Sequence, residues 1–221
     1  MVGRWHSKRL KVGLHLVLTI LSIIGSAAFA MSGALVAIEE DYDIFGIMVL
    51  GFMTAFAGGM IRNLIVGLPI AMVWHQNGAF IAALIAILLA ILSPSAVVKY
   101  GLKTMLIFDA LGLSTFAVEG ALYAARIHAP LSTVMVAAVM TGTGGGVIRD
   151  ILAQRKPLVL RADIYAMWAL LAGAIIGFQW IQTQKDWHIY TLIIAIFGLR
   201  LLSMKFHWRL PHARESLNST P

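Results

Sequence analysis

The amino-acid sequence predicts an all-α membrane protein with seven transmembrane helices, arranged as two inverted three-helix repeats plus a seventh helix. The 221-residue chain is 60% hydrophobic and 12% charged, with a mean hydropathy of +0.86. A soluble domain is about 45–50% apolar and about 25% charged. The apolar runs are continuous rather than alternating, which favours helices over the strands of a membrane barrel. The chain also matches itself after a shift of 87 residues, which indicates an internal repeat.

The first three helices are separated by short polar segments. A basic stretch, residues 1–11, leads into an apolar run that is too long for the core of a signal peptide, so we interpret it as a retained helix. The acidic loop of residues 39–43 follows, and a segment around Pro69 precedes the third run. We expect helices at residues 12–37, 44–66 and 78–92, which together form the first repeat, residues 12–92.

The other four helices are separated in the same way. Pro94, Pro130 and Pro157 lie in polar turns, and proline is poorly tolerated inside a helix. A turn containing Lys185 separates the last two apolar runs. We expect helices at residues 104–125, 131–153, 163–182 and 188–205, of which the first three form the second repeat, residues 104–182, within one membrane domain.

The repeat is most specific in the second and fifth helices. Six identical residues coincide there at the shift of 87: Met53, Thr54, Gly58, Gly59, Ile61 and Arg62 fall on Met140, Thr141, Gly145, Gly146, Ile148 and Arg149. Each repeat holds three helices, so the second copy enters the membrane from the opposite face. Proteins with inverted repeats commonly carry their transport pathway at the interface between the repeats.

The composition excludes several kinds of chemistry. The chain has no cysteine, which excludes disulfides, thiolate catalysis and cysteine-ligated zinc. Its net charge is +7, but the basic residues lie mostly at the ends and between apolar runs, which indicates lipid headgroups rather than nucleic acid. No histidine pair has the spacing of a helical zinc site. We expect that the protein is not an enzyme and that it binds no cofactor, no resident metal ion and no nucleic acid.

Glycine clusters interrupt the second and fifth helices at matched positions. Glycine costs about 1 kcal/mol relative to alanine in a helix interior, and clusters of it allow a kink that frees backbone carbonyls. Such carbonyls are tolerated in a membrane only where protein or water satisfies them. The matched breaks therefore predict a conduction or binding site, whereas the alternative is close helix packing. The glycines concerned are Gly58, Gly59, Gly144, Gly145 and Gly146.

Charged residues follow these clusters and also occur in the fourth helix. Arg62 and Arg149 either lie near the membrane faces with their side chains among headgroups, or line the mouths of an aqueous path. Asp150 is a candidate partner for Arg149 or for another arginine. Asp109 is expected near the start of the fourth helix, where a carboxylate favours the helix dipole. Glu119 lies deeper, and an ionisable residue there is a functional candidate by default.

Hydroxyl groups in the first, second, fourth and fifth helices are candidates for completing a weak cation site. The alternative for each of them is a hydrogen bond to helix backbone. The candidates are Ser32, Thr54, Ser114, Thr141 and Thr143.

Two segments of the second half resemble a known family signature. They are DALGLSTFAVEG at residues 109–120 and TGTGGGVIRD at residues 141–150, followed by Pro157 and by DIYA at 163–166. With them, the chain resembles the prokaryotic trimeric intracellular cation (TRIC) channels over about residues 14–205. That family overlaps a bacterial membrane family often labelled glycine transporter.

The resemblance implies a homotrimer in the bacterial inner membrane, with membrane lipids around it. Each protomer would hold its own pore between the glycine-kinked second and fifth helices, and the conducted ions would be K⁺ and Na⁺. The first repeat departs from the glycine-rich pattern, because Phe56 stands where the second repeat has Thr143. Phe56 is therefore a candidate for narrowing the path.

Two further function classes stay open from the residues. An alternating-access carrier for a small zwitterion such as glycine would also use helix breaks that expose backbone dipoles. The other class is a structural membrane scaffold, which the charged residues within the membrane helices make less favoured than a transport protein.

Overall fold

The computed structural model describes the backbone of residues 2–92, 94–161 and 164–208, and the side chains of residues 15–92, 101–160 and 164–208. Within these ranges the regular structure is entirely helical. The elements, in order, are α1 (Val2–Glu39), α2 (Ile44–Val66), the short 3-10 helix η1 (Ile70–His75), α3 (Asn77–Leu92), α4 (Pro94–Arg126), α5 (Leu131–Leu152), α6 (Leu158–Arg161), α7 (Tyr165–Gly177) and α8 (Asp186–Lys205).

Five of these helices are long and apolar enough to cross a bilayer. The candidate spans are His15–Glu39 in α1, α2, Gly101–Arg126 in α4, α5 and α8. The apolar helices α3 and α7 are shorter, with 16 and 13 residues. The described residues thus contain five clear apolar spans and two apolar helices that are shorter than a typical transmembrane helix.

Some helix ends differ from the sequence-based expectation. α4 begins at Pro94 rather than at 104, because proline is well tolerated in the first turn of a helix. α7 ends at Gly177 rather than at 182, and Gln179 beyond it has a left-handed φ of 55°. The expected start of this helix at 163 lies outside the described residues. The short helices η1 and α6 were not expected.

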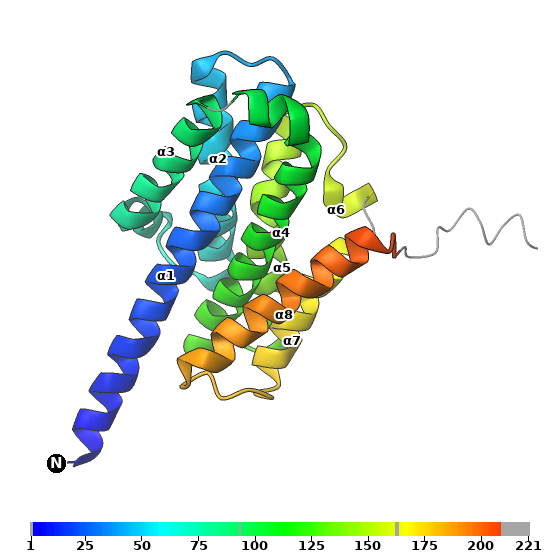
Figure 1. The fold of residues 1–221 in the computed structure, drawn as a ribbon. Coiled ribbons are helices and arrows are strands. Elements are labelled where there is room, and N and C mark those ends of the chain that lie inside the picture. The colour runs from blue at the N-terminus through cyan, green and yellow to red at the C-terminus, as the bar shows by residue number, and fades with distance from the viewer. Residues whose placement is uncertain (1, 93, 162–163, 209–221) are drawn as a thin grey trace, which may run out of the picture.

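The helices form one bundle around α1, α2, α4 and α5 (Figure 1). α3 packs against α1 and α2 on one side, and α7 packs against α5 and α4 on the other. α8 lies across the outside of α4 and α7. Two apolar clusters fill the bundle, one centred on α2 and α3 and the other on α4, α5, α7 and α8, and α1 contributes to both.

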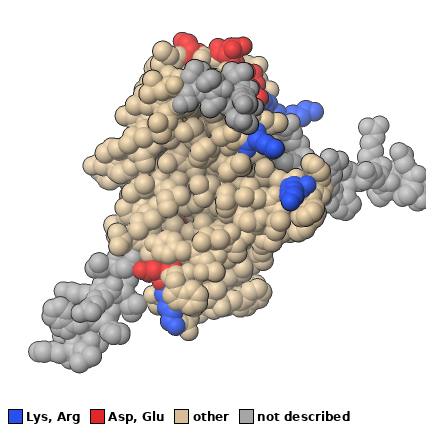
Figure 2. Space-filling view, in the orientation of Figure 1, with Lys and Arg blue, Asp and Glu red and all other residues tan. Residues whose placement is uncertain are grey.

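The burial pattern differs from that of a soluble protein in two respects. Large apolar side chains such as Ile85 on α3 and Ile194 on α8 are exposed, whereas six of the described charged side chains are buried among the helices. On the face seen in Figure 2, charged side chains are few and lie near the top, on the upper right side and near the bottom, while uncharged side chains cover the rest of the surface. Exposed apolar surface of this extent fits lipid rather than water. The buried charged side chains are Arg62, Asp109, Glu119, Arg149, Asp150 and Arg200.

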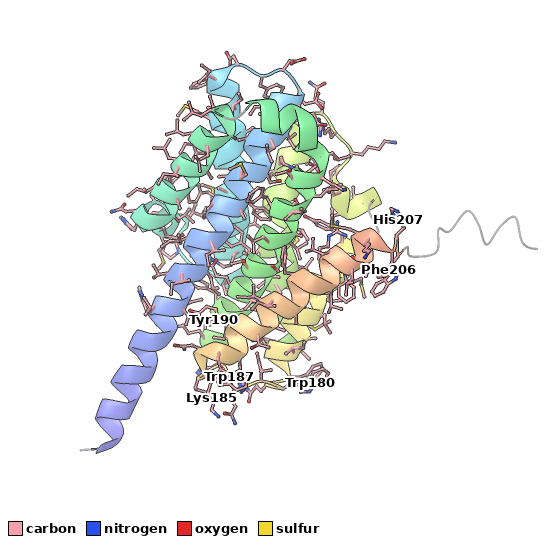
Figure 3. All side chains as sticks on the ribbon, in the orientation of Figure 1. Trp180, Lys185, Trp187, Tyr190, Phe206 and His207 are labelled. Atoms are coloured by element: carbon pink, nitrogen blue, oxygen red, sulfur yellow. The ribbon has the colours of Figure 1, made fainter. Side chains whose placement is uncertain are left out.

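Aromatic side chains mark both ends of α8 (Figure 3). Trp180 and Trp187 lie exposed at its beginning, and Phe206 lies exposed at its end. The helix has 20 residues, so it is about 30 Å long, which is about the thickness of a bilayer's hydrocarbon core. Tryptophan and other aromatics favour the membrane–water interface. This placement is consistent with α8 spanning the membrane.

Candidate functional site

The glycines of α2 and α5 lie where these two helices touch. A methyl group on Gly58 would overlap the backbone carbonyl of Thr141, and one on Gly145 would overlap the carbonyl of Thr54. Both helices remain α-helical through their glycines, so the expected interruption is not seen. Close packing of the two backbones, the alternative interpretation, is what the structure shows.

The remaining glycines of the clusters have different surroundings. Gly144 faces the backbone of Gly58, and Gly146 faces the Tyr165 hydroxyl and the Asp109 carboxylate. Gly59 has only ordinary contacts, because a methyl group there would lie 3.7 Å from its nearest neighbour. The five glycines are therefore not equivalent, although the sequence presents them alike.

The candidate hydroxyls are engaged mostly within their own helices. Thr54 Oγ1 donates to the carbonyl of Leu50 at 2.6 Å, and Thr141 Oγ1 donates to that of Ala137 at 2.5 Å. Thr143 and Ser114 likewise donate to carbonyls one turn earlier. Such bonds bend helices slightly and satisfy hydroxyls in apolar surroundings. Ser32 differs, because its Oγ contacts the Arg149 guanidinium at 2.5 Å.

Arg149 is the centre of a buried polar cluster between α1, α4 and α5. Its Nη1 donates to Asp109 Oδ1 at 2.6 Å and to Ser32, while its Nε donates to Asp150 Oδ1 at 2.8 Å. Asp150 Oδ2 in turn accepts from the backbone N–H of Leu158, which fixes the chain that enters α6. The guanidinium is fully buried. The predicted Arg149–Asp150 pair is therefore present.

Arg62 forms a second buried cluster, between α1, α2 and α4. Its Nη1 lies 2.6 Å from Glu119 Oε1, and the same oxygen accepts from Ser22 Oγ at 2.8 Å. The Arg62 Nε donates to Asn63 Oδ1, as Arg149 does to the following Asp150. The guanidinium also lies over the Tyr123 ring, 3.9 Å from its centroid. Desolvated cation–π contacts of this kind contribute about 2 kcal/mol.

These clusters exclude one of the two alternatives given for the arginines and correct the expectation for Asp109. Neither Arg62 nor Arg149 reaches to headgroups, because their side chains are 2% and 0% exposed. Asp109 is not near a helix start, since α4 begins fifteen residues earlier at Pro94. The helix dipole therefore does not stabilise it, and Arg149 supplies the counter-charge instead. The Arg62–Glu119 pair was not predicted, because 57 residues of sequence separate its members.

A cavity of about 760 Å³ opens beside the Arg62 cluster. Its walls come from α1, α2, η1, α3 and α4. We call the part that is lined by the buried residues Ser22 and Arg62, together with Tyr123, its inner end. His15, His75 and Arg126 also line it, and no described lining residue is a carboxylate. A volume of this size is typical of a site for a small solute. The cavity thus connects the outside of the bundle with a buried ion pair.

Several residues of the site had no clear signal in the sequence. Ser22 and Tyr123 become relevant only through Glu119 and Arg62. Arg200 on α8 is buried, and its guanidinium lies 4.7 Å from the centroid of the Tyr165 ring. Phe56, in contrast, is placed away from the contact of α2 with α5, because its ring stacks on Phe80 of α3 at 4.2 Å.

Comparisons with known proteins identify the family of this chain. A family model described as "Glycine transporter" matches residues 19–94 and 106–181. The UPF0126 membrane protein YvgT of Bacillus subtilis is 49% identical over 193 residues, which cover 87% of this chain and 95% of that protein. A crystal structure of a prokaryotic TRIC channel in 0.5 M KCl aligns with a TM-score of 0.80 and 36% identity, over 89% of this chain and all of that chain. This chain belongs to the prokaryotic TRIC family.

Two further comparisons extend the match. The TRIC orthologue of Rhodobacter sphaeroides aligns with a TM-score of 0.74 and 31% identity, over 86% of this chain and 98% of that chain. The inner membrane protein YadS of Escherichia coli K12 is 31% identical over 86% of this chain and 93% of its own length. With its apolar spans, this TRIC-family chain is a multi-pass integral membrane protein.

Proposed function

We propose that this TRIC-family chain is a channel for the monovalent cations K⁺ and Na⁺. The observation that carries the proposal is the similarity to TRIC channel structures over nearly the whole chain. The chain would act as a homotrimer, with a separate pore in each protomer between α2 and α5. The 760 Å³ cavity would be the entrance of that pore, and the Arg62–Glu119 pair would lie at its inner end.

We further propose that the protomer consists of two inverted repeats, residues 12–92 and 104–182, plus α8 as the seventh transmembrane helix. Contacts that recur in both halves support this. Gly25 packs on the Phe116 ring, and Gly112, which follows Gly25 by 87 residues, packs on the Phe29 ring. The two segments matched by the family model are also offset by 87 residues.

Each proposed repeat contains one short helix at the same place in its order of elements. η1 precedes α3 in the first half, and α6 precedes α7 in the second. A 16-residue helix is about 24 Å long and a 13-residue helix about 20 Å. Each is shorter than the hydrocarbon core is thick. The short helix that precedes it would cover the remaining depth of the membrane, at a place inside the protein where irregular backbone is tolerated.

The contact of α2 with α5 would have to open for ions to pass. Gly58 and Gly145 place each helix against a carbonyl of the other, which leaves no space for an ion between them. Separation of the two helices would expose the carbonyls of Thr54 and Thr141 to the path. Carbonyl oxygens that replace the hydration shell are a known way to conduct K⁺. We therefore assign this contact as the closed part of the pore.

Planar-bilayer recording of the purified protein in asymmetric KCl tests the channel. We expect discrete current steps that reverse near the equilibrium potential of K⁺. A silent bilayer, accompanied by saturable glycine uptake and counterflow in liposomes, would instead establish a carrier. The described basic lining of the cavity is the observation that favours this second candidate, since Arg62 and Arg126 suit a carboxylate ligand.

A cysteine introduced into the cavity is expected to make the current sensitive to a thiol reagent. The chain has no cysteine of its own, so Thr19→Cys creates a unique target on the cavity wall. Modification with a positively charged methanethiosulfonate reagent should reduce the K⁺ current at least about twofold, because it adds a charge of like sign near the path. Single-channel recording before and after addition measures this.

The matched control is Ile194→Cys on the exposed face of α8, where 70% of the side chain is accessible. The reagent should leave its current unchanged. If both variants respond equally, or if Thr19→Cys is modified without any change in current, the cavity does not belong to the conduction path.

A further inference from the structure

The two buried arginine clusters use the same set of positions but distribute the charges differently. Ser22 and Asp109 are 87 residues apart, as are Ser32 and Glu119 and the two arginines. α1 therefore supplies a serine to each cluster, and α4 supplies a carboxylate to each. Glu119, the carboxylate of the Arg62 cluster, is equivalent in the repeat to Ser32 of the Arg149 cluster. Asp109, a carboxylate of the Arg149 cluster, is equivalent to Ser22 of the Arg62 cluster.

We infer that Ser22 and Glu119 form one exchangeable counter-charge site for Arg62, and that Ser22 determines the charge at the inner end of the cavity. The geometry carries the exchange. Ser22 Oγ and Arg62 Nη1 contact the same oxygen, Glu119 Oε1, at 2.8 and 2.6 Å. A carboxylate at position 22 would thus reach the guanidinium, as Asp109 reaches Arg149 at the equivalent position.

The position of the carboxylate matters because only one of the two sites faces the cavity. Ser22 is among the residues that line the cavity, whereas Glu119 is fully buried behind them. The described ionisable side chains around this space are His15, Arg62, His75, Tyr123 and Arg126. An acid at position 22 would be the first carboxylate among the described lining residues. In a low-dielectric cleft such a charge raises the local concentration of cations.

The exchange is tested without reference to transport, by the yield and thermal stability of the protein in detergent. Glu119→Ser leaves Arg62 without its buried counter-charge and should lose most of the folded protein. Adding Ser22→Asp should restore folding to near the wild-type level. The matched control adds Ser26→Asp to Glu119→Ser instead. Ser26 lies one helical turn further along α1, is buried and has no described contact with Arg62. We expect this control to give no rescue. Failure of the Ser22→Asp rescue, or equal rescue by Ser26→Asp, overturns the exchange.

The effect on the cavity rests on the proposed channel function and is measured separately. Ser22→Asp alone should increase the K⁺ current about threefold in about 10 mM KCl, where the Debye length is about 30 Å, and should leave it unchanged near 1 M, where it is about 3 Å. The Arg149 cluster shows that one arginine accommodates two carboxylates. If the wild type conducts but the current of Ser22→Asp is unchanged at low salt, position 22 does not set the charge of the path. If the wild type is silent, the proposed function fails while the rescue still decides the exchange.

Discussion

Replacing Arg149 with methionine is expected to destabilise the folded protein by about 3–5 kcal/mol, the usual cost of removing one partner of a buried ion pair. The substitution leaves Asp109 and Asp150, both buried, without a counter-charge. Methionine has a similar length, so the loss reflects charge rather than volume. For a chain of this size we expect the apparent melting temperature in detergent to fall by roughly 10 °C. Thermal unfolding followed by size-exclusion chromatography measures it.

Arg155→Met is the matched control, because Arg155 also pairs with two carboxylates but does so near the surface. Its guanidinium contacts Glu39 and Glu40, and all three side chains are partly exposed. Partial burial lowers the pKa of Arg155, but hydrogen bonds to Glu40 and Glu39 outweigh this and raise the pKa overall. Its substitution should cost no more than about 1 kcal/mol, since solvent screens exposed pairs. Equal losses in the two variants would contradict the special role of the buried cluster.

Gly58→Ala is expected to cost about 3 kcal/mol or more, at the upper end of the range for overpacked sites. The added methyl group would overlap the backbone carbonyl of Thr141, and a backbone atom cannot move aside by changing a rotamer. α2 and α5 would have to separate along their contact. Gly145→Ala should behave alike, because it meets the carbonyl of Thr54 and the ring of Phe29. The yield of folded protein and its melting temperature report the loss.

Gly59→Ala provides the control within the same helix turn. Its methyl group would meet Arg62 Nη2 at 3.7 Å, an ordinary contact, and alanine favours a helix over glycine by about 1 kcal/mol. We expect this variant to be at least as stable as the wild type. If Gly58→Ala and Gly59→Ala melt at the same temperature, the backbone contact of α2 with α5 is not a determinant of the fold.

More of the fold than of the candidate site could be predicted from the sequence. Continuous apolar runs predict membrane helices because the bilayer demands that backbone polar groups pair within the segment. Helix ends were less predictable. Pro94 was expected in a turn and instead begins α4, since proline suits both a turn and a first helical position. The end of α7 at Gly177 likewise depends on packing rather than on composition.

The candidate site was predicted as a set of residues but not as a set of contacts. The repeat singled out Arg62, Arg149 and the glycines, and the expected depth of Glu119 within a membrane helix made it a functional candidate. The partner of Glu119 could not be predicted, because α1, α2 and α4 meet there from distant parts of the chain. Gly58 and Gly59 look alike in sequence, yet only Gly58 faces another backbone.

The sequence by itself determined the family, the membrane setting and the positions that recur in both halves, because these depend on composition and on identities at a constant spacing. The tertiary structure alone decided which charges neutralise each other and which glycines carry the contact of α2 with α5. The physical reason is that a buried charge requires a partner within hydrogen-bond distance. Only the packing of antiparallel α1 and α4 against α2 and α5 brings Ser22 and Glu119 to Arg62, and Ser32 and Asp109 to Arg149.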